Sequence, residues 1–302
     1  MSLANVDAEA LPTAAPFELP PLPPVLEHLL ACVEEGRYAE DDLVALVQHD
    51  ASYRTRLLRV ANSTYFASPE VVHRPAQAIQ VLGEDVALAV LMTYGLVDLR
   101  PSLPIRATFP YLKLVRHCLG AGFITHYLTT RNAAATAQER SRALIAGLLH
   151  DCGKILLVYN RPEIAAPYYG FPKRRDTAAQ VLLKDEADQF GMNHVDAGAF
   201  FLDHASEKLS WLSGAIRHHE ARATLVTGEE KKLMNAVHAG SIVANAFRLA
   251  FDRPVSIDAC VQDPVWASYG ELGGAEVAHV DAFSAALQGL GTEAQAFVDA
   301  VL

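Results

Sequence analysis

The sequence predicts an all-α protein, a multi-helix domain preceded by a smaller helical lobe. Three observations support this fold class. Apolar residues recur at helical spacing along most of the chain, and no segment shows the strict alternation of a half-buried strand. Hydrophobic residues make up 51% of the 302 residues, which is enough for a substantial core and excludes global disorder.

Composition narrows the classes of function. The formal net charge of −10 disfavours general binding to nucleic acid or to anionic membranes, because the overall field repels polyanions. The longest nearly uncharged apolar run, Val86–Val97, is well short of the roughly 20 residues that a membrane-spanning helix needs. We therefore expect no membrane insertion.

The first residues and the cysteines both favour a cytoplasmic protein. The first 24 residues lack the basic and apolar regions of a signal peptide, and residues 1–18 are predicted to form a flexible, proline-rich tail. The four cysteines stand far apart in apolar stretches, without any CxxC pair, so we expect buried, reduced thiols.

Residues 19–104 are predicted to form the smaller lobe. A helix follows Pro24, a second follows the acidic run 40–42, and Asp50 is expected to cap a third. Further helices are predicted over 75–82 and 84–97. The two prolines of segment 100–104 then stop the chain from continuing as a helix, and we place the lobe boundary there.

Residues 105–302 are predicted to form the larger domain. The apolar spacing predicts helices over 110–130, 138–160, 175–189, 193–204, 208–220 and 230–250, with a less regular helical tail to the end of the chain. No fixed repeat is visible, which disfavours a solenoid.

Two helices of this domain carry polar residues on their apolar faces. His117 lies in the stripe formed by Leu114, Ala121 and Ile124, whereas His126 falls on the opposite side. Taken alone, an inward histidine is more often a hydrogen-bonded core residue than a metal ligand. The predicted helix over 138–160 supplies candidate partners for His117.

Asp151 shares a face with Leu144, Leu148 and Ile155, and His150 lies beside it. A buried carboxylate without a partner would cost several kcal/mol, so it must be protonated, hydrogen-bonded or bound to a cation. Adjacent His and Asp side chains, with His117 from another helix, would make a partial metal site.

Three further histidines are candidates. His194 begins a helix, and His218 and His219 flank the buried stripe at the end of the next one. For that pair the alternative is a purely electrostatic role, because a helix C-terminus favours positive charge.

The segment GLLHDCGK at 147–154, together with His117, His194 and IRHHE at 216–220, resembles the HD superfamily of metal-dependent phosphohydrolases. The whole chain resembles more closely the HDOD proteins, the HD-related output domains of bacterial signalling. The motifs at 19–25, 47–50, 56–63 and 78–83 support the latter, and the likeness spans about residues 19–250. It implies a helical HD-like fold and a regulatory role.

By this resemblance His117, His150 and Asp151 occupy first metal positions, and His194, His218 and His219 those of a second metal. The candidate ions are Fe, Mn, Zn, Ni and Mg. The chain departs from the pattern at 238–241, where Ser241 stands in place of the last metal carboxylate. A neutral hydroxyl is a poorer ligand for a hard cation.

A second departure concerns the HD-GYP phosphodiesterases of cyclic dinucleotides. Their Gly-Tyr-Pro signature is absent after Glu220. We therefore favour a non-catalytic signalling module that binds a protein or small ligand. The alternative is a phosphohydrolase acting on a nucleotide or cyclic dinucleotide, in which Asp151 holds a metal and Lys154 stabilises phosphate charge; a solvated lysine is equally compatible with position 154.

A signalling protein is the expected partner, and a small phosphate-containing ligand is a second candidate. Arg54, Arg56 and Arg59 lie close together on one predicted helix and could bind an acidic protein surface or an isolated phosphate. A solvated helix face is the alternative for these three residues.

Overall fold

The computed structural model confirms the all-α prediction. It describes the chain except for residues 1–16, 36–37, 105–108, 132–133, 172, 174, 206–209, 221–227 and 270–279, and the residues that it describes contain no strand. The helices pack around one continuous apolar core that runs through both predicted lobes. The division at residues 104 and 105 stays a prediction.

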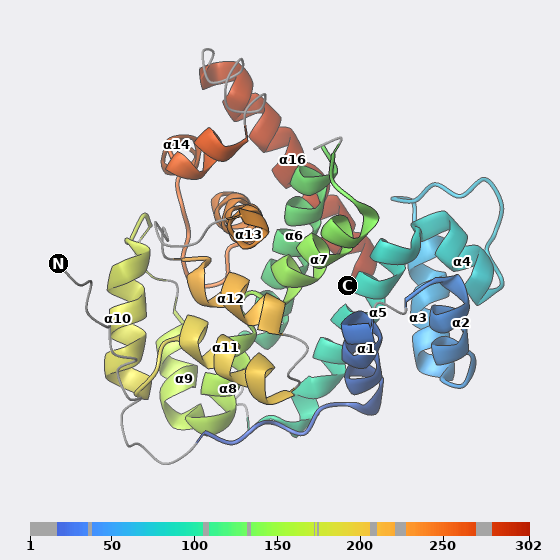
Figure 1. Ribbon diagram of the computed structural model, residues 1–302, viewed down its shortest axis with the longest axis horizontal. Coiled ribbons are helices and arrows are strands. Elements are labelled where there is room, and N and C mark those ends of the chain that lie inside the picture. The colour runs from blue at the N-terminus through green and yellow to red at the C-terminus, as the bar shows by residue number, and fades with distance from the viewer. Residues whose placement is uncertain are drawn as a thin grey trace.

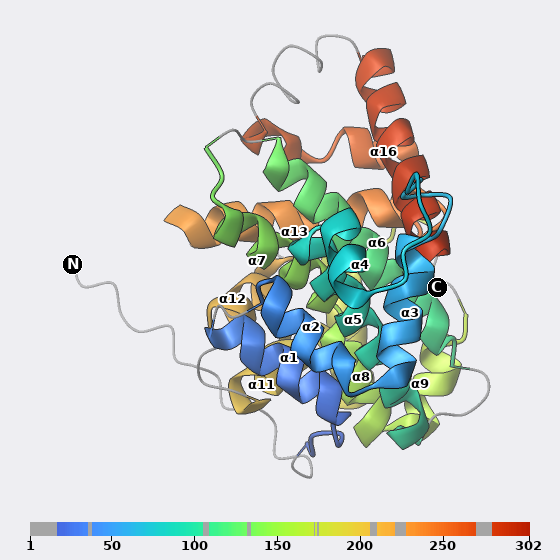
Figure 2. The same ribbon diagram turned by 90° about the vertical axis from the view of Figure 1, so that its right-hand side faces the viewer.

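The first helices lie together on one side of the molecule (Figures 1 and 2). The predicted cap is confirmed, since the Asp50 carboxylate accepts hydrogen bonds from the backbone N–H groups of Ser52 and Tyr53, at 2.9 and 3.1 Å. The predicted helices over 75–82 and 84–97 are confirmed within two residues. The bounds are α1 Pro24–Glu35, α2 Glu40–Gln48, α3 Ala51–Ala61, α4 Pro75–Leu82, α5 Glu84–Leu99 and the short 3-10 turn η1 Arg100–Ser102.

The remaining helices build the larger part of the fold. The long helix α6 is central, because α7, α13 and α16 all pack against it. Their bounds are α6 Tyr111–Thr130, α7 Ala137–Leu149, α8 Cys152–Asn160, α9 Pro162–Tyr169, α10 Ala179–Phe190, α11 His194–Ala205, α12 Ser210–His218, α13 Gly228–Ala246, α14 Ile257–Val261, η3 Pro264–Ser268 and α16 Val280–Val301.

The prediction of one helix over 138–160 was wrong. Helix α7 ends at Leu149 and α8 begins at Cys152, with Asp151 outside helical geometry (φ −101°, ψ 13°). Apolar spacing misses this break, because helical periodicity resumes after only two residues. After the break, α8 packs against α11 at Gly153, where a Cβ atom would lie 1.8 Å from the His194 carbonyl oxygen.

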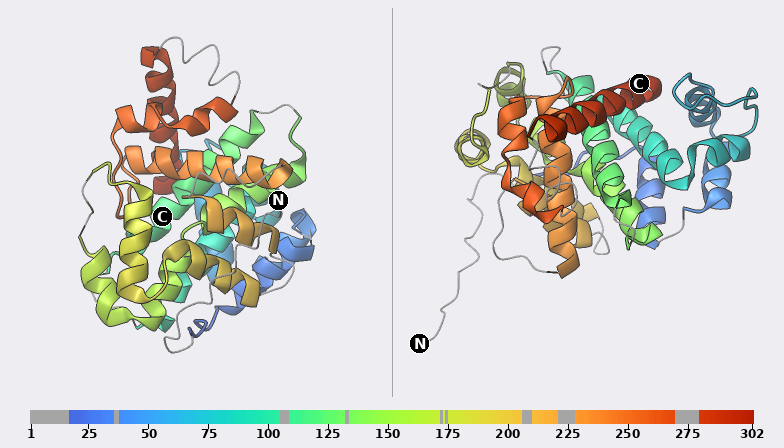
Figure 3. Two further views of the ribbon diagram at one scale, coloured as in Figure 1. Left: turned by 60° about the vertical axis from the view of Figure 1, so that its left-hand side comes forward. Right: turned by 90° about the horizontal axis from the view of Figure 1, so that it is seen from above.

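Helix α16 connects the two sides of the molecule. It crosses α6 and ends beside the N-terminal helices (Figure 3, right). There the Val301 carbonyl accepts hydrogen bonds from the Arg59 guanidinium at 2.9 Å and from the Tyr94 hydroxyl at 2.5 Å. This joins α3, α5 and α16 at one point.

Three further sequence expectations concern the tail, the cysteines and membrane insertion. The predicted tail lies outside the described residues except for positions 17 and 18, where Glu18 exchanges two backbone hydrogen bonds with the Asn160 side chain. All four cysteines are buried thiols that form no disulfide among the described residues, as predicted. The stretch Ala137–Asn160 is long and apolar enough to cross a membrane, but 89% of its apolar window is buried inside the fold.

Candidate metal centre

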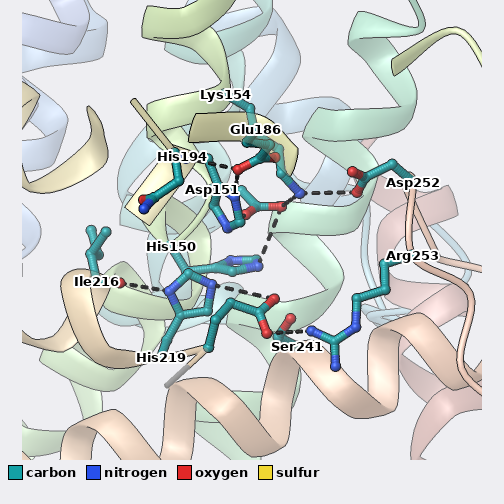
Figure 4. A network of polar contacts seen from close by, with 12 residues as sticks. His150, Asp151, Lys154, Glu186, His194, Ile216, His219, Ser241, Asp252 and Arg253 are labelled. Carbon is teal, nitrogen blue, oxygen red and sulfur yellow. Dashed lines mark hydrogen bonds and ion pairs between the residues drawn. The ribbon is translucent and has the colours of Figure 1, made fainter. Parts of the chain in front are cut away.

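A polar pocket lies at the junction of α7 and α8, which we call the Asp151 pocket. The Asp151 Oδ2 atom is 3.5 Å from His117 Nε2 on α6 and 3.6 Å from His150 Nε2, and its Oδ1 atom is 3.4 Å from His194 Nε2 at the start of α11. Figure 4 shows the rings of His194 and His219 on the same side of the pocket. The structure thus gathers these residues from four separate segments.

The ligand atoms fall into two sets that share Asp151. One set, the His117 group, consists of His117, His150 and Asp151; the other, the His194 group, consists of Asp151, His194 and His219. Within each set the ligand atoms lie within 4.8 Å of one another. His218 belongs to neither set: it is partly exposed, and the chain turns after α12 so that His219 points inward instead.

The hydrogen bonds fix which nitrogen of each ring carries a proton. The Nδ1 atoms of His117, His150 and His219 lie 3.0, 2.8 and 2.7 Å from backbone carbonyl oxygens of Leu249, Gly147 and Ile216. A carbonyl only accepts, so each Nδ1 must donate, and in a neutral ring Nε2 is then a lone pair. His117 Nε2 and His150 Nε2 face each other at 3.2 Å, and His219 Nε2 has no hydrogen-bond partner among the described residues.

These rings are neutral near pH 7. Burial lowers the pKa of His117 and of His150 to about 4, and burial together with the neighbouring His150 lowers the pKa of His219 to about 3. Two neutral rings that direct lone pairs at each other, beside a carboxylate, form an arrangement that a bound cation would stabilise. The geometry therefore fits a metal site.

Lys154 is buried, so the interpretation of a solvated lysine was wrong. Its ammonium lies 2.8 Å from Asp151 Oδ2 and 3.0 Å from Asp252 Oδ1. Burial raises the pKa of Asp151, but Lys154 and the surrounding histidines outweigh burial and hold that pKa well below its usual range. Burial lowers the pKa of Lys154, and the two carboxylates more than reverse this. Both groups are therefore charged.

The cavity inside the pocket has a volume of about 10 Å³. That is room for about one water molecule or one ion. Four carboxylates line it, from Asp151, Glu186, Glu220 and Asp252, against two basic side chains, from Lys154 and Arg253. His117 is neutral, and a protonated His194 beside Glu186 would offset one further charge, so an excess of negative charge remains, which a divalent cation would balance.

Ser241, the residue at which the sequence departs from the HD pattern, lies in the wall of this cavity. Ser241 is buried there and accepts a hydrogen bond from Asn245 at 3.4 Å. Close to it lies Arg253 (Figure 4), which pairs with the buried carboxylate of Glu220. The wall on this side offers a hydroxyl and an ion pair in place of a free carboxylate.

A family model described as the HDOD domain matches residues 19–205, well over half of the chain. The chain belongs to the HDOD family. No protein of curated function matches it.

Solved structures share the fold. An HDOD domain protein of unknown function from Geobacter sulfurreducens is 19% identical, with a TM-score of 0.69 and 94% of each chain covered. A candidate signal transduction protein from Marinobacter aquaeolei is 18% identical, with a TM-score of 0.54, and the match covers 91% of this chain and 60% of that one. A candidate metal-dependent phosphohydrolase from Shewanella amazonensis is 13% identical, with a TM-score of 0.53 and coverage of 92% and 93%.

Sequence reasoning missed three charged residues of this HDOD protein. Glu186, Asp252 and Arg253 all line the cavity, but none lies in a motif that the resemblance uses. Glu186 stands between Asp185 and Asp188 on α10, so local charge density indicates a solvated helix face there. Only the fold brings this helix against α11.

Unlike the histidines, the three arginines of α3 do not share one site in the structure. Arg56 forms an ion pair with Asp98 at 2.7 Å, and Arg59 donates to the Tyr94 hydroxyl and the Val301 carbonyl. Only Arg54 is exposed without a partner among the described residues. Two of the three arginines considered for an acidic surface or a phosphate are therefore engaged within the protein itself.

Proposed function

We propose that this HDOD protein is a signal-transduction module that acts by binding and does not hydrolyse phosphate esters. The size of the Asp151 cavity is the observation that carries the proposal. Pockets for small-molecule ligands enclose roughly 300–1,000 Å³, whereas this one encloses about 10 Å³. Asp151, Lys154, Glu186 and His194 are each at most 5% exposed, so a nucleotide or cyclic dinucleotide has no access to them.

The proposal includes one divalent cation, or a pair, held by Asp151 together with His117 and His150 or with His194 and His219. Donor sets rich in imidazole suit Fe, Zn and Ni better than Mg, which prefers oxygen ligands. A cation there would supply positive charge to the pocket and would cross-link α6, α8, α11 and the end of α12. Its role in a binding module is to hold these helices together.

The second candidate is a metal-dependent phosphohydrolase. Two ligand sets that share one carboxylate favour it, as does the fold shared with the candidate phosphohydrolase from Shewanella amazonensis. Two observations weigh against it. Lys154 is held between Asp151 and Asp252 and so is not free to contact phosphate, and Ser241 supplies no anion.

A protein partner is part of the proposal, because a module without a substrate transmits a signal through contact. The name of the protein from Marinobacter aquaeolei supports a signalling role. The N-terminal lobe, or the groove between the lobes, is the proposed docking region. Arg54, which has no partner among the described residues, is the arginine of α3 best placed to contact an acidic surface.

The test measures cation content and turnover on the same preparations. Purified protein is stripped with a chelator, reloaded with Mn²⁺, Fe²⁺, Zn²⁺, Ni²⁺ or Mg²⁺, and analysed for bound metal and for hydrolysis of nucleotides and cyclic dinucleotides. Asp151→Asn keeps the shape of the side chain and removes its charge. The control is His204→Gln, which changes an exposed histidine on the same helix as His194.

We expect at least one transition-metal ion per chain in the native protein and in His204→Gln, a loss of binding of at least tenfold in Asp151→Asn, and no turnover in any variant. Turnover by the native protein that Asp151→Asn abolishes would establish the hydrolase instead. Native protein that binds no ion above the buffer level would refute the cation site.

A further inference from the structure

The two ligand groups are anchored by different kinds of hydrogen-bond acceptor. In the His117 group both rings donate from Nδ1 to neutral backbone carbonyls. In the His194 group, His219 also donates to a carbonyl, but His194 Nδ1 lies 2.6 Å from the Glu186 Oε2 atom. One of the four rings is therefore backed by a full negative charge.

Glu186 is buried in the middle of α10, and three hydrogen bonds hold it. Its Oε1 atom accepts from the Tyr169 hydroxyl at 2.8 Å, and its Oε2 atom accepts from the backbone N–H of His194 at 2.9 Å as well as from the ring. It is 1% exposed. Both oxygens therefore have fixed hydrogen-bond partners, and the carboxylate accepts from both the backbone and the side chain of His194.

The remaining ring nitrogen of His194 faces the pocket. His194 Nε2 is buried, has no hydrogen-bond partner in the part of the chain that the structure describes, and lies 3.4 Å from Asp151 Oδ1. A carboxylate that accepts from Nδ1–H fixes the orientation of an imidazole and increases the electron-donating power of its Nε2 atom. Glu186 acts on this atom alone, because the other three rings of the pocket donate to carbonyls.

We propose that Glu186 is a positioning residue that strengthens cation binding at the His194 group and leaves the His117 group unaffected. This inference rests on the proposed function, which places a cation in the Asp151 pocket. The two ligand groups would then differ in their affinity for a cation, since only the His194 group contains a histidine that donates to an anion.

The test uses Co²⁺ as the only ligand, because its visible absorption spectrum reports on the ligands that surround it. Glu186→Gln removes the charge and keeps an amide oxygen that can accept from His194. The substitution is made in two backgrounds: His117→Ala retains the His194 group, and His219→Ala retains the His117 group. Where His117→Ala does not fold, His150→Ala removes the same group.

The matched control is Asp188→Asn, which makes the same change of charge on the same helix, at an exposed residue that pairs with Lys184. Far-ultraviolet circular dichroism of the metal-free variants verifies that each one is folded. A purely structural role for Glu186 would change binding in both backgrounds alike, so the difference between the backgrounds is the decisive quantity.

We expect Glu186→Gln to raise the dissociation constant for Co²⁺ about 10- to 100-fold in the His117→Ala background and less than about twofold in the His219→Ala background. Asp188→Asn should change neither. Equal losses in both backgrounds, or no loss in either, would overturn the role of Glu186 even though the cation site stands. Native protein that binds no Co²⁺ would overturn the cation site itself, and this inference with it.

Discussion

The Asp151 pocket and helix α3 both concentrate charged residues, but only the pocket isolates them from water. Asp151 and Lys154 are at most 5% exposed, whereas the side chains of the Arg56–Asp98 pair on the N-terminal side retain 29% and 31% of their exposure. Exposed ion pairs contribute about 0–1 kcal/mol. Removing one partner of a buried pair costs considerably more, because the other charge stays buried.

The two regions also differ in whether their polar groups are matched. On α3, Arg56 and Arg59 each meet acceptors from α5 or α16, so the arginines fasten helices together. In the pocket, lone pairs of His117 and His150 face each other, and no described residue forms a hydrogen bond with His219 Nε2. Matched charges indicate a structural role, and an excess of electron-pair donors indicates a site for a cation.

The largest expected effect compares alanine substitutions at two glycines, Gly153 beside the pocket and Gly95 on the N-terminal side. A Cβ atom at Gly153 would meet the backbone of His194 at 1.8 Å, whereas one at Gly95 would meet the Leu26 side chain at 3.0 Å. Gly153→Ala should therefore lower the free energy of unfolding by about 5 kcal/mol, since α8 and α11 would have to separate. Gly95→Ala should lower it by about 1 kcal/mol.

Urea unfolding followed by circular dichroism measures both values. Equal losses for the two variants would contradict the close approach of α8 and α11, and with it the geometry that places His194 beside Asp151.

The second effect compares two carboxylates. Asp151→Ala leaves the Lys154 ammonium with Asp252 as its one ion-pair partner among the described residues and should lower the free energy of unfolding by about 3 kcal/mol. Asp98→Ala releases Arg56 to solvent and should cost less than about 1 kcal/mol. Unfolding in urea at pH 7 with a chelator present measures the pair without a contribution from bound metal. A loss from Asp98→Ala as large as that from Asp151→Ala would remove the distinction between the two regions.

Much of the fold is predictable from the sequence, because helix positions depend on local pattern. The cap at Asp50, the helices over 75–82 and 84–97, and the inward placement of His117 and Asp151 all follow from apolar spacing and first-turn chemistry. The break between α7 and α8 does not, because it depends on how closely α8 approaches α11 and not on any change in periodicity.

The candidate site is predictable only where a motif marks it. His150 and Asp151 belong to a recognisable segment, but Glu186 and Asp252 reach the pocket from a charged helix and from the loop after α13. Their local sequence is that of solvated residues. Burial of these carboxylates is a property of tertiary contact, which no single helix pattern contains.

The smallest expected effect per residue is a dependence of stability on pH that comes from the pocket. Burial lowers the pKa of His117 and of His150 to about 4 and that of His219 to about 3, whereas the unfolded chain takes up these protons near pH 6.5. Between those values the unfolded state binds more protons, so the free energy of unfolding falls as the pH falls. Their stabilising contribution is complete above pH 6.5.

Between pH 6.5 and 5.5 we expect a loss of about 1 kcal/mol for each of these histidines in metal-free protein. The pKa of His194 is raised, because burial lowers it by less than Glu186 raises it. The stabilising contribution of His194 is therefore complete below pH 6.5 and does not offset the loss. His219→Gln should reduce the pH dependence, whereas His204→Gln, on the exposed face of α11, should not. Urea unfolding at both pH values measures this, and a free energy of unfolding that stays constant would mean that the pocket does not hold its imidazoles neutral.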